Sequence, residues 1–269
     1  MKIAVTGSQG TLGREITRRG CIPIDIDVRN GTLIRNEIEH INPDVLIHCA
    51  AITDVAYCEN QFKESFEVNV RGTSNVVAAM SKDSLFIYIS SDHVFSGENW
   101  FSSGYGEHHK PSPVNRYGFS KWAGELMAGT GICDSIVVRS SRCFDYAWAE
   151  PTIQKLNKGE TVIMTDLIKR SFVHVNHFVD GLMFLVNNYE RFDENTINIS
   201  GTDVFSYYNF WLILKTTLNL GGIILPRKTK LEGECPRPFR AGLNIHLAKK
   251  LGFPLFSMVD GIKLLKEGI

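Results

Sequence analysis

The sequence lacks the features that mark membrane proteins and strongly charged proteins. Its 269 residues contain no apolar run near the roughly 20 residues that a membrane-spanning helix needs, and the run after Met1 and Lys2 is too short for a signal peptide. Lys plus Arg and Asp plus Glu both number 29, so no charge excess favours nucleic acid or an anionic membrane. We therefore expect a cytoplasmic protein that binds neither.

Patterned cysteines are also missing. The six cysteines show neither a C-x-x-C motif nor the spacing of a zinc site, so we expect reduced thiols and no bound metal. With 43% hydrophobic residues, the chain is long enough to bury one large core or two closely joined cores.

What the first half does contain is an alternation of short apolar runs with longer amphipathic stretches, which is typical of a parallel sheet wound with helices. We expect strands at 3–5, 22–26, 45–48, 85–89, 135–138 and 196–199. Helices are expected at 11–19, 31–41, 62–80, 116–128, 176–188 and 207–219.

This pattern predicts an α/β fold, a Rossmann-like doubly wound parallel sheet with a small C-terminal substrate-binding lobe. Residues 1–143 and 170–200 are expected to form the dinucleotide-binding domain. Residues 144–169 and 201–269 are expected to form the substrate-binding lobe.

A glycine-rich turn follows the first expected strand, where Thr6-Gly7-Ser8-Gln9-Gly10-Thr11-Leu12-Gly13 leads into a helix. Glycines allow the tight turn and let backbone N–H groups at the helix N-terminus approach a pyrophosphate. The last glycine also allows the helix to pack closely on the strand. The turn therefore predicts dinucleotide binding, with NADPH or NADH as the cofactor.

Two acids, Asp25 and Asp27, end the second expected strand. An acid about 20 residues after the glycines often hydrogen-bonds the adenosine ribose and disfavours the 2′-phosphate of NADP. Nearby arginines could instead bind that phosphate, namely Arg14, Arg18, Arg19 and Arg29. The choice between NAD and NADP stays open on the sequence.

Tyr117 and Lys121 lie four residues apart in the expected helix 116–128, so their side chains share one face. A nearby ammonium stabilises a phenolate and lowers the pKa of the phenol, which suits a tyrosine that donates a proton. Because the same spacing occurs on many surface helices, its meaning depends on the motifs around it.

Taken together and in order, the motifs resemble the extended short-chain dehydrogenase/reductase superfamily, and most closely the dTDP-4-dehydrorhamnose reductase family. They are the glycine turn, Pro43-Asp44-Val45 to Ala51, Val68-Asn69-Val70, Ser90-Ser91-Asp92-His93-Val94-Phe95, Tyr117 to Lys121 with Ala123-Gly124-Glu125, and Arg237-Pro238. The resemblance implies NAD(P)H-dependent reduction of the C4 ketone of a nucleotide-linked 4-keto-6-deoxyhexose, as in rhamnose-type polysaccharide biosynthesis.

The resemblance also implies roles for individual residues. Ser91 would hold the substrate carbonyl, Tyr117 would donate the proton, and Lys121 would bind the nicotinamide ribose and lower the pKa of the phenol. The residues expected to bind the cofactor are Gly7, Gln9, Gly10, Thr11, Leu12, Gly13, Asp27, Val28, Ala50, Ala51, Asn69, Tyr117 and Lys121. Those expected to bind the nucleotide sugar are Asp92, His93, Val94, Trp100, Arg142 and Arg237.

Two positions depart from the family pattern near the expected sugar site. His93 stands where family members usually carry an aromatic such as Tyr, and Arg142 stands where they usually carry Trp. The identity of the hexose therefore stays open. So does a second acid/base role for His93 in an epimerisation, because an imidazole titrates near neutral pH.

Two alternatives to the reductase stay open as well. One is an epimerase or dehydratase of the same superfamily, although Asp92 is followed by His93 rather than by the glutamate typical of dehydratases. The other is a non-catalytic NADP-binding regulatory subunit, since the resemblance extends to the β subunit of methionine adenosyltransferase. The sequence does not decide whether the chain forms a homodimer.

Overall fold

The chain divides into two units in a computed structural model that describes residues 1–98 and 103–268. Unit 1 comprises Met1–Phe95, Lys110–Arg139 and Leu185–Ile197. Unit 2 comprises Ser96–His109, Ser140–Phe184 and Asn198–Ile269. The functional division predicted from the sequence, with substrate binding assigned to 144–169 and 201–269, stays a prediction.

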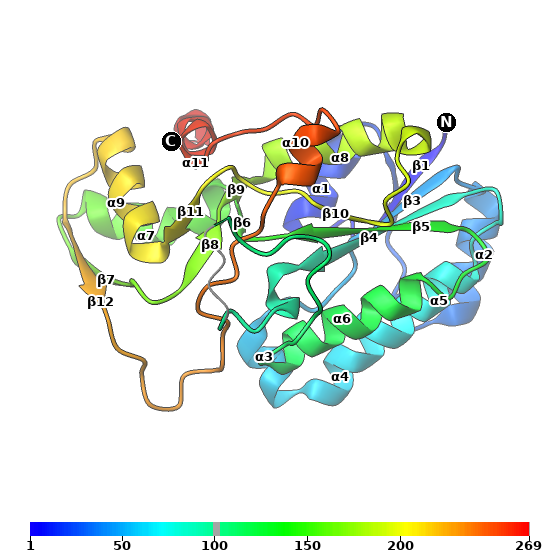
Figure 1. Cartoon of the computed structure of the whole chain (residues 1–269), viewed down its shortest axis with the longest axis horizontal. Coiled ribbons are helices and arrows are strands. Elements are labelled where there is room, and N and C mark those ends of the chain that lie inside the picture. The colour runs from blue at the N-terminus through cyan, green and yellow to red at the C-terminus, as the bar shows by residue number, and fades with distance from the viewer. Residues whose placement is uncertain (99–102, 269) are drawn as a thin grey trace. The chain divides into compact units, whose positions relative to one another are not determined.

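A six-stranded sheet organises unit 1, with the strand order β10-β5-β4-β3-β1-β2 (Figure 1). Its strands are β1 (Ile3–Thr6), β2 (Ile22–Ile24), β3 (Val45–His48), β4 (Leu85–Ser91), β5 (Asp134–Ser140) and β10 (Thr196–Asn198). Strand β1 pairs in parallel with β2 and β3, and β3 pairs in parallel with β4. The chain thus winds outward in both directions from β1, which confirms the predicted doubly wound, Rossmann-like class.

The helices of this unit cover the sheet on both sides. They are α1 (Thr11–Arg18), α2 (Gly31–Ile41), α3 (Val55–Asn60), α4 (Phe62–Phe66), α5 (Thr73–Ala78) and α6 (Arg116–Ala128). Helix α5 packs between α2 and α6 along one face, and α1 lies on the other (Figure 1). Helix α8 (Val175–Asn188) continues from unit 2 into unit 1, where the 3-10 turn Tyr189–Arg191 follows it.

Helix α2 shows why the sequence folds locally as predicted. The Asn30 side chain accepts a hydrogen bond from the Leu33 N–H and caps the helix, which spans Gly31–Ile41. Ile34, Ile38 and Ile41 recur at the spacing of one helix face, and all three are buried. They join the core beneath the sheet, which also contains Ala4, Leu46, Phe86, Tyr88 and Val137.

The helix expected at 62–80 is present over 62–78, but it contains a π-helical turn that was not predicted. Helix α4 ends at Phe66, a π-helical turn spans Glu67–Gly72, and α5 begins at Thr73. A π-turn inserts one residue into a helix and often marks a functional site. Here it carries Asn69, which hydrogen-bonds the segment after β3. Helix α3, capped by Asp54, was not predicted.

Unit 2 consists of small paired strands and helices around an aromatic core. The pairs are β6 (Cys143–Phe144) with β9 (Val173–His174), β7 (Thr161–Thr165) with β12 (Ile223–Arg227), and β8 (Lys169–Ser171) with β11 (Val204–Ser206). The helices are α7 (Tyr146–Asn157), α9 (Tyr207–Leu218), α10 (His246–Lys250) and α11 (Met258–Leu264), followed by the 3-10 turn Leu265–Gly268. Phe172 stacks on Phe210 with ring centroids 4.4 Å apart. Of these elements only α9 was predicted.

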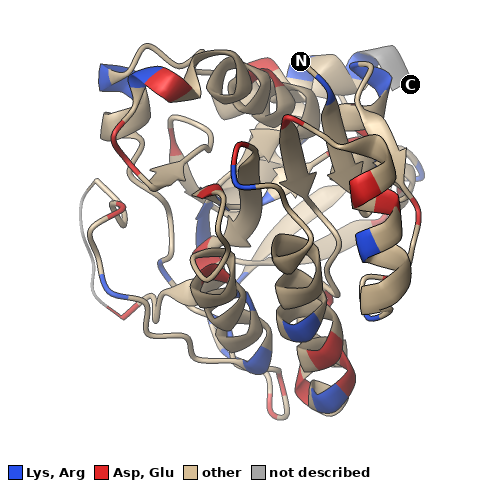
Figure 2. Ribbon diagram, turned by 90° about the vertical axis from the view of Figure 1, so that its right-hand side faces the viewer, with Lys and Arg blue, Asp and Glu red and all other residues tan. Residues whose placement is uncertain are grey.

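Charged residues of both signs are interspersed along the elements rather than gathered by sign (Figure 2). This distribution agrees with the equal numbers of acids and bases in the sequence. None of the helices in residues 1–98 and 103–268 combines the length and the apolar character needed to cross a membrane.

Candidate active site

The glycine turn lies at the carboxyl end of β1, where the winding direction of the sheet reverses. Gly7 has a φ of +67°, and a Cβ there would lie only 2.6 Å from the Ala50 backbone nitrogen. A Cβ on Gly13 would lie 2.1 Å from the Gly7 carbonyl oxygen. Only glycine fits either position, and the turn thereby brings the ends of β1 and β3 together where doubly wound sheets bind ligands.

The start of α1 offers donors suited to a pyrophosphate. Gly10 precedes the helix and caps it with no side chain, and the first turn contains no acid. Ser8, which the sequence did not single out, has a buried hydroxyl with no hydrogen-bond partner among residues 1–98 and 103–268. A buried unpaired hydroxyl is unfavourable unless a ligand completes it. The loop therefore fits a dinucleotide pyrophosphate.

Both acids beyond β2 already have partners within unit 1. Asp25 accepts a hydrogen bond from the Gln9 amide at 3.0 Å. Asp27 forms an ion pair with Arg29 at 2.6 Å, and these hydrogen bonds lower the pKa of the Asp27 carboxyl. Arg14 donates to the Gln9 carbonyl at 2.6 Å. Two guanidinium groups therefore lie near these acids, Arg29 on Asp27 and Arg14 on the Gln9 backbone.

Tyr117 and Lys121 both lie on α6, as predicted, and both are buried. The helix begins after Asn115, whose side-chain oxygen accepts from the Gly118 N–H at 2.7 Å. A Cβ on Gly118 would lie 2.1 Å from the His93 carbonyl oxygen, so this glycine lets the first turn of α6 press against the end of β4. Tyr117 is 8% exposed.

Ser91 ends β4 and begins a 3-10 turn over Asp92–Val94. Its hydroxyl accepts from the His93 N–H at 3.2 Å and lies 3.4 Å from an Asp92 carboxylate oxygen. The His93 ring packs edge-on against Tyr117, with centroids 5.2 Å apart. The turn that Ser91 starts is therefore in direct contact with the proposed proton donor.

The orientation of the His93 ring follows from its neighbour. Because the Asn115 side-chain oxygen is engaged by Gly118, the Asn115 amide nitrogen faces His93 Nδ1 at 3.1 Å. An amide nitrogen can only donate, so Nδ1 accepts and the ring proton lies on Nε2. His93 is thus a fixed, buried wall of the site rather than a mobile loop residue.

Lys121 is 3% exposed, and its Nζ lies 4.2 Å from the centre of the Tyr88 ring. Burial lowers the pKa of its ammonium from 10.5 to about 8. The Tyr88 hydroxyl donates to the Lys121 backbone carbonyl at 3.3 Å. A buried lysine in such surroundings is typical of a functional site.

Asn69 connects the π-turn to the candidate site. Its side-chain oxygen accepts from the Ile52 N–H at 2.7 Å, and its amide nitrogen donates to the Ile52 carbonyl and to Ser120 Oγ, both at 2.9 Å. Ser120 Oγ in turn donates to the Tyr117 carbonyl at 2.8 Å. Asn69 therefore holds the segment after β3 against α6; its predicted contact with the cofactor stays a prediction.

A second buried network of hydrogen bonds joins β1, β3 and α5. Thr73 Oγ1 donates to the Asn69 carbonyl at 2.8 Å, so it must accept from His48 Nε2 at 3.0 Å. His48 Nδ1 then accepts from Thr6 Oγ1 at 2.7 Å. Burial, together with the nearby Lys121 charge, lowers the pKa of His48 from 6.5 to about 3. This histidine is therefore uncharged and structural at neutral pH.

A buried ion pair joins α6 to β5. Glu125 accepts from Arg139 through both carboxylate oxygens, at 2.9 and 2.8 Å, and also accepts from Ser90 Oγ at 2.6 Å. The two charged side chains are only 6% and 8% exposed. Because Ser90 precedes Ser91, the pair fixes α6 against the end of β4.

The other predicted residues of unit 1 lie in the segments that follow its strands. Ala50 and Ala51 follow β3 and are half-buried, and Val28 packs against Gly72 of the π-turn. The remaining cofactor positions, Gln9, Thr11 and Leu12, lie in or just after the glycine turn, and Val94 is buried in the turn after Ser91.

Two of the residues predicted to bind the nucleotide sugar lie outside unit 1. Arg142 and Arg237 belong to unit 2, where the Arg142 guanidinium lies 4.4 Å from the Trp148 ring centre. Arg142 Nε is buried and has no hydrogen-bond partner within the described part of the chain. Trp100 lies outside the described residues. The predicted roles of all three stay predictions.

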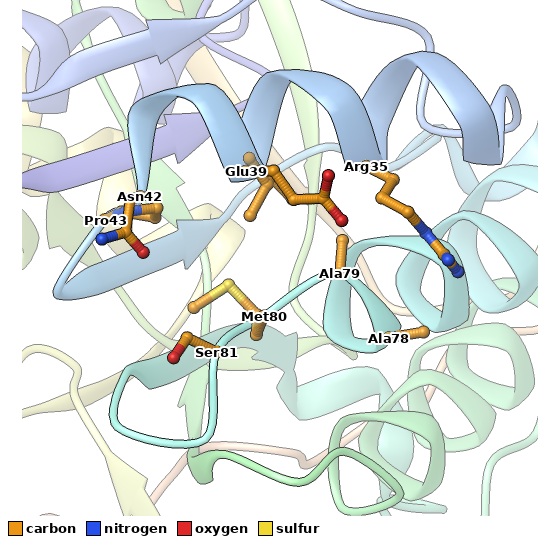
Figure 3. A pocket seen from close by; sticks show the side chains of 9 residues that line it. Arg35, Glu39, Asn42, Pro43, Ala78, Ala79, Met80 and Ser81 are labelled. Carbon is orange, nitrogen blue, oxygen red and sulfur yellow. The ribbon is translucent and has the colours of Figure 1, made fainter.

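A separate groove of about 320 Å³ lies between α2 and the end of α5. Figure 3 shows Arg35 and Glu39 of α2 facing Ala79 and Met80. Its residues precede β3 and β4, so the groove opens at the amino edge of the parallel strands. Ligands of doubly wound sheets bind at the carboxyl edge, and the groove is therefore distinct from the candidate active site.

Sequence motifs missed the buried partners of the site, chiefly Ser8, His48, Tyr88 and Ser120. The only available signal was polar residues inside otherwise apolar strands, as with His48 in β3. Buried polar residues nearly always have hydrogen-bond partners, but a sequence does not show which residues those partners are.

Known proteins match this chain along most of its length. The model of the RmlD substrate binding domain family matches residues 1–255. The spore coat polysaccharide biosynthesis protein SpsK of Bacillus subtilis is 24% identical, over 93% of this chain and 92% of its own. A dTDP-4-dehydrorhamnose reductase of Aggregatibacter actinomycetemcomitans is 31% identical, but the match spans only 53% of this chain and 52% of the reductase.

The fold of this chain is also that of solved reductases. A crystal structure of dTDP-4-dehydrorhamnose reductase from Bacillus anthracis in complex with NADP superimposes with a TM-score of 0.89. The two chains are 25% identical, and the superposition covers 100% of each. The resemblance predicted from the motifs is therefore confirmed, and this chain belongs to the RmlD substrate binding domain family.

Proposed function

We propose that this chain is an NADPH-dependent reductase that converts the C4 ketone of a nucleotide-linked 4-keto-6-deoxyhexose to an alcohol. The observation that carries the proposal is Tyr117, buried against the turn that Ser91 begins and one helical turn from the buried Lys121. The names of the relatives, which include dTDP-4-dehydrorhamnose reductases, support the same reaction. The six free cysteines suit the reducing conditions of the cytoplasm, where we place it.

In the proposed reaction the bound NADPH supplies the hydride. Tyr117 donates its phenolic proton to the ketone oxygen as negative charge develops there. The Ser91 hydroxyl accepts from the His93 N–H, and its own proton is engaged by a long contact to Asp92, from which it turns to donate a hydrogen bond to the same oxygen. The Lys121 ammonium stabilises the resulting Tyr117 phenolate, which makes the proton easier to release.

Residues of the glycine turn and of α1 would hold the cofactor. The N–H groups that open α1 and the unpaired Ser8 hydroxyl would donate to the pyrophosphate. Lys121 would donate to the nicotinamide ribose. Trp100, Arg142 and Arg237 are proposed to contact the nucleotide sugar from their segments of the chain.

The surroundings of the adenosine position favour NADPH over NADH. Asp27, the acid that would repel a 2′-phosphate, is paired with Arg29 at 2.6 Å. Arg14 is exposed beside the glycine turn and pairs with a backbone carbonyl rather than with a carboxylate. A guanidinium in this position can form two hydrogen bonds to a phosphate. The NADP bound to the Bacillus anthracis relative supports the same choice.

The experiment is NADPH oxidation by the purified chain with dTDP-, UDP- and GDP-linked 4-keto-6-deoxyhexoses. We expect stoichiometric loss of NADPH, and a kcat for Tyr117→Phe lower by about 10²- to 10⁴-fold with little change in NADPH affinity. The matched control is Tyr57→Phe, an exposed tyrosine whose loss should leave kcat unchanged.

Two outcomes would reject the proposal. Sugar turnover without net NADPH loss would identify an epimerase or dehydratase. NADPH binding without oxidation of any of these sugars would favour a regulatory subunit.

A further inference from the structure

Tyr88 lies directly beneath Lys121, although it belongs to none of the motifs that identify the site. It is fully buried in β4, in register with His48 of β3, and the two rings stack with centroids 5.9 Å apart. Burial raises the pKa of the Tyr88 phenol well above its usual value, so the hydroxyl keeps its proton. Tyr88 is thus a fixed neutral ring and a permanent donor.

The ring face of Tyr88 contacts the lysine charge. Lys121 Nζ lies 4.2 Å from the ring centroid, well inside the distance at which an ammonium is attracted to an aromatic face. Within the part of the chain that the structure describes, no carboxylate forms an ion pair with Lys121. The Tyr88 ring therefore contacts this ammonium directly, whereas Glu125 attracts it without forming an ion pair.

The hydroxyl of Tyr88 contacts the helix that carries Lys121. It donates to the Lys121 carbonyl at 3.3 Å, from the side of α6 where Gly124 lies. A Cβ at position 124 would approach the Tyr88 oxygen to 2.0 Å, so the tyrosine hydroxyl and a side chain at 124 exclude each other. Gly124 therefore makes room for Tyr88.

We propose that Tyr88 is a positioning residue for Lys121, with its ring face holding the ammonium and its hydroxyl fixing the turn of α6 that presents it. This inference rests on the proposed function in one respect: the function assigns Lys121 its role toward Tyr117 and the cofactor. The contacts themselves lie entirely within unit 1.

Other titratable groups also act on Lys121, and all of them stay in place when only the ring is altered. They are His48 of β3, Cys49 after it, Cys58 of α3 and Glu125 of α6. The two thiols and the carboxylate favour the charged lysine, whereas burial disfavours it. A change confined to the Tyr88 ring therefore isolates the contribution of that ring to the pKa of Lys121.

The test is a ¹³C NMR titration of the lysine side chains in the full-length protein without ligand, with Lys121→Met assigning the signal. Wild-type Lys121 is expected to titrate near pH 8. Tyr88→Leu removes the ring that stabilises the ammonium, so the pKa of Lys121 should fall by roughly one further unit. Tyr88→Phe keeps the ring and should leave that pKa within a few tenths of the wild-type value.

A second pair of variants covers the case in which Tyr88→Leu does not fold. Phenylalanine and pentafluorophenylalanine installed at position 88 have nearly the same shape, but the fluorinated ring no longer attracts a cation on its face. The fluorinated variant should show the lower Lys121 pKa, and the alkaline limb of its NADPH oxidation should move to lower pH by the same amount.

An unchanged Lys121 titration in either ring-altered variant would overturn the proposal. Because the NMR titration needs neither NADPH nor a sugar, this failure is distinguishable from failure of the proposed function. If Lys121 shifts as expected while no keto-sugar is reduced, the positioning role stands and the assigned reaction falls.

Discussion

The two ends of the candidate cofactor site are built from opposite kinds of polar contact. Beneath Tyr117 and Lys121, the polar groups are buried and bonded to one another, as in the Glu125–Arg139 pair at 8% and 6% side-chain exposure. Beyond β2, the Asp27–Arg29 pair is about half exposed, at 52% and 46%. Ion pairs between an acid and an arginine therefore serve different purposes at the two ends of the site.

The difference lies in what each pair costs to break. A buried charge left without its partner is strongly unfavourable, so the inner contacts hold the reacting groups in one arrangement. Exposed pairs contribute little to stability because water and salt screen them. Their charges are therefore available to select a ligand, here between NADP and NAD.

The largest effect should come from breaking the inner pair. Glu125→Ala leaves Arg139 buried and uncompensated, and we expect the free energy of unfolding to fall by about 3–5 kcal/mol. The outer control is Asp27→Ala, for which we expect a change within about 1 kcal/mol. Urea unfolding followed by circular dichroism measures both. Equal losses in the two variants would contradict the comparison.

The next effect is the pH dependence that His48 gives to the inner network. The folded protein keeps His48 uncharged down to about pH 3, whereas the unfolded chain protonates it near 6.5. Unfolding between these values takes up a proton, so stability is lost as the pH falls, by up to about 1.4 kcal/mol per pH unit.

Comparison with His48→Gln isolates this contribution. Burial also lowers the pKa of His177, so the wild-type slope is not due to His48 alone. Unfolding measured between pH 7 and pH 5 should show a shallower slope in the variant. Parallel stability curves for the two proteins would show that His48 does not carry the expected charge penalty.

The smallest effect should appear at the outer end and in binding rather than stability. Arg14→Ala is expected to raise the KM for NADPH about tenfold and to change the KM for NADH less than about twofold, since only NADPH carries the 2′-phosphate. Arg18→Ala is the control, because Arg18 pairs with Glu15 instead. Equal changes for both coenzymes in Arg14→Ala would place the phosphate elsewhere.

The sequence predicted the parts of the fold that depend on local patterns. Buried apolar runs located all six strands of the larger sheet, and the glycines located the turn after β1. The spacing of Tyr117 and Lys121 correctly placed them on one helix, whereas their burial was not predicted from it. These features depend on neighbours in the chain, which a sequence shows directly.

Features that depend on distant neighbours were not predicted. The π-turn around Asn69 interrupts an otherwise good helix pattern, because Asn69 bonds to Ile52 and Ser120 in other elements. Tyr88 looked like an ordinary strand residue, since its value as a contact depends on α6 lying above it. The small strands of unit 2 were not predicted either, because the alternation of apolar runs with amphipathic stretches fades after Val138.

Gly118 and Gly124 have a consequence for how the site acquires its order. Each glycine inside α6 weakens the isolated helix by about 0.5–1 kcal/mol relative to alanine. The close approaches that they allow, to the His93 carbonyl and the Tyr88 hydroxyl, exist only when α6 lies on the end of β4. The helix that carries Tyr117 and Lys121 is therefore formed by docking rather than before it, so partial unfolding that releases α6 abolishes the site in the same step.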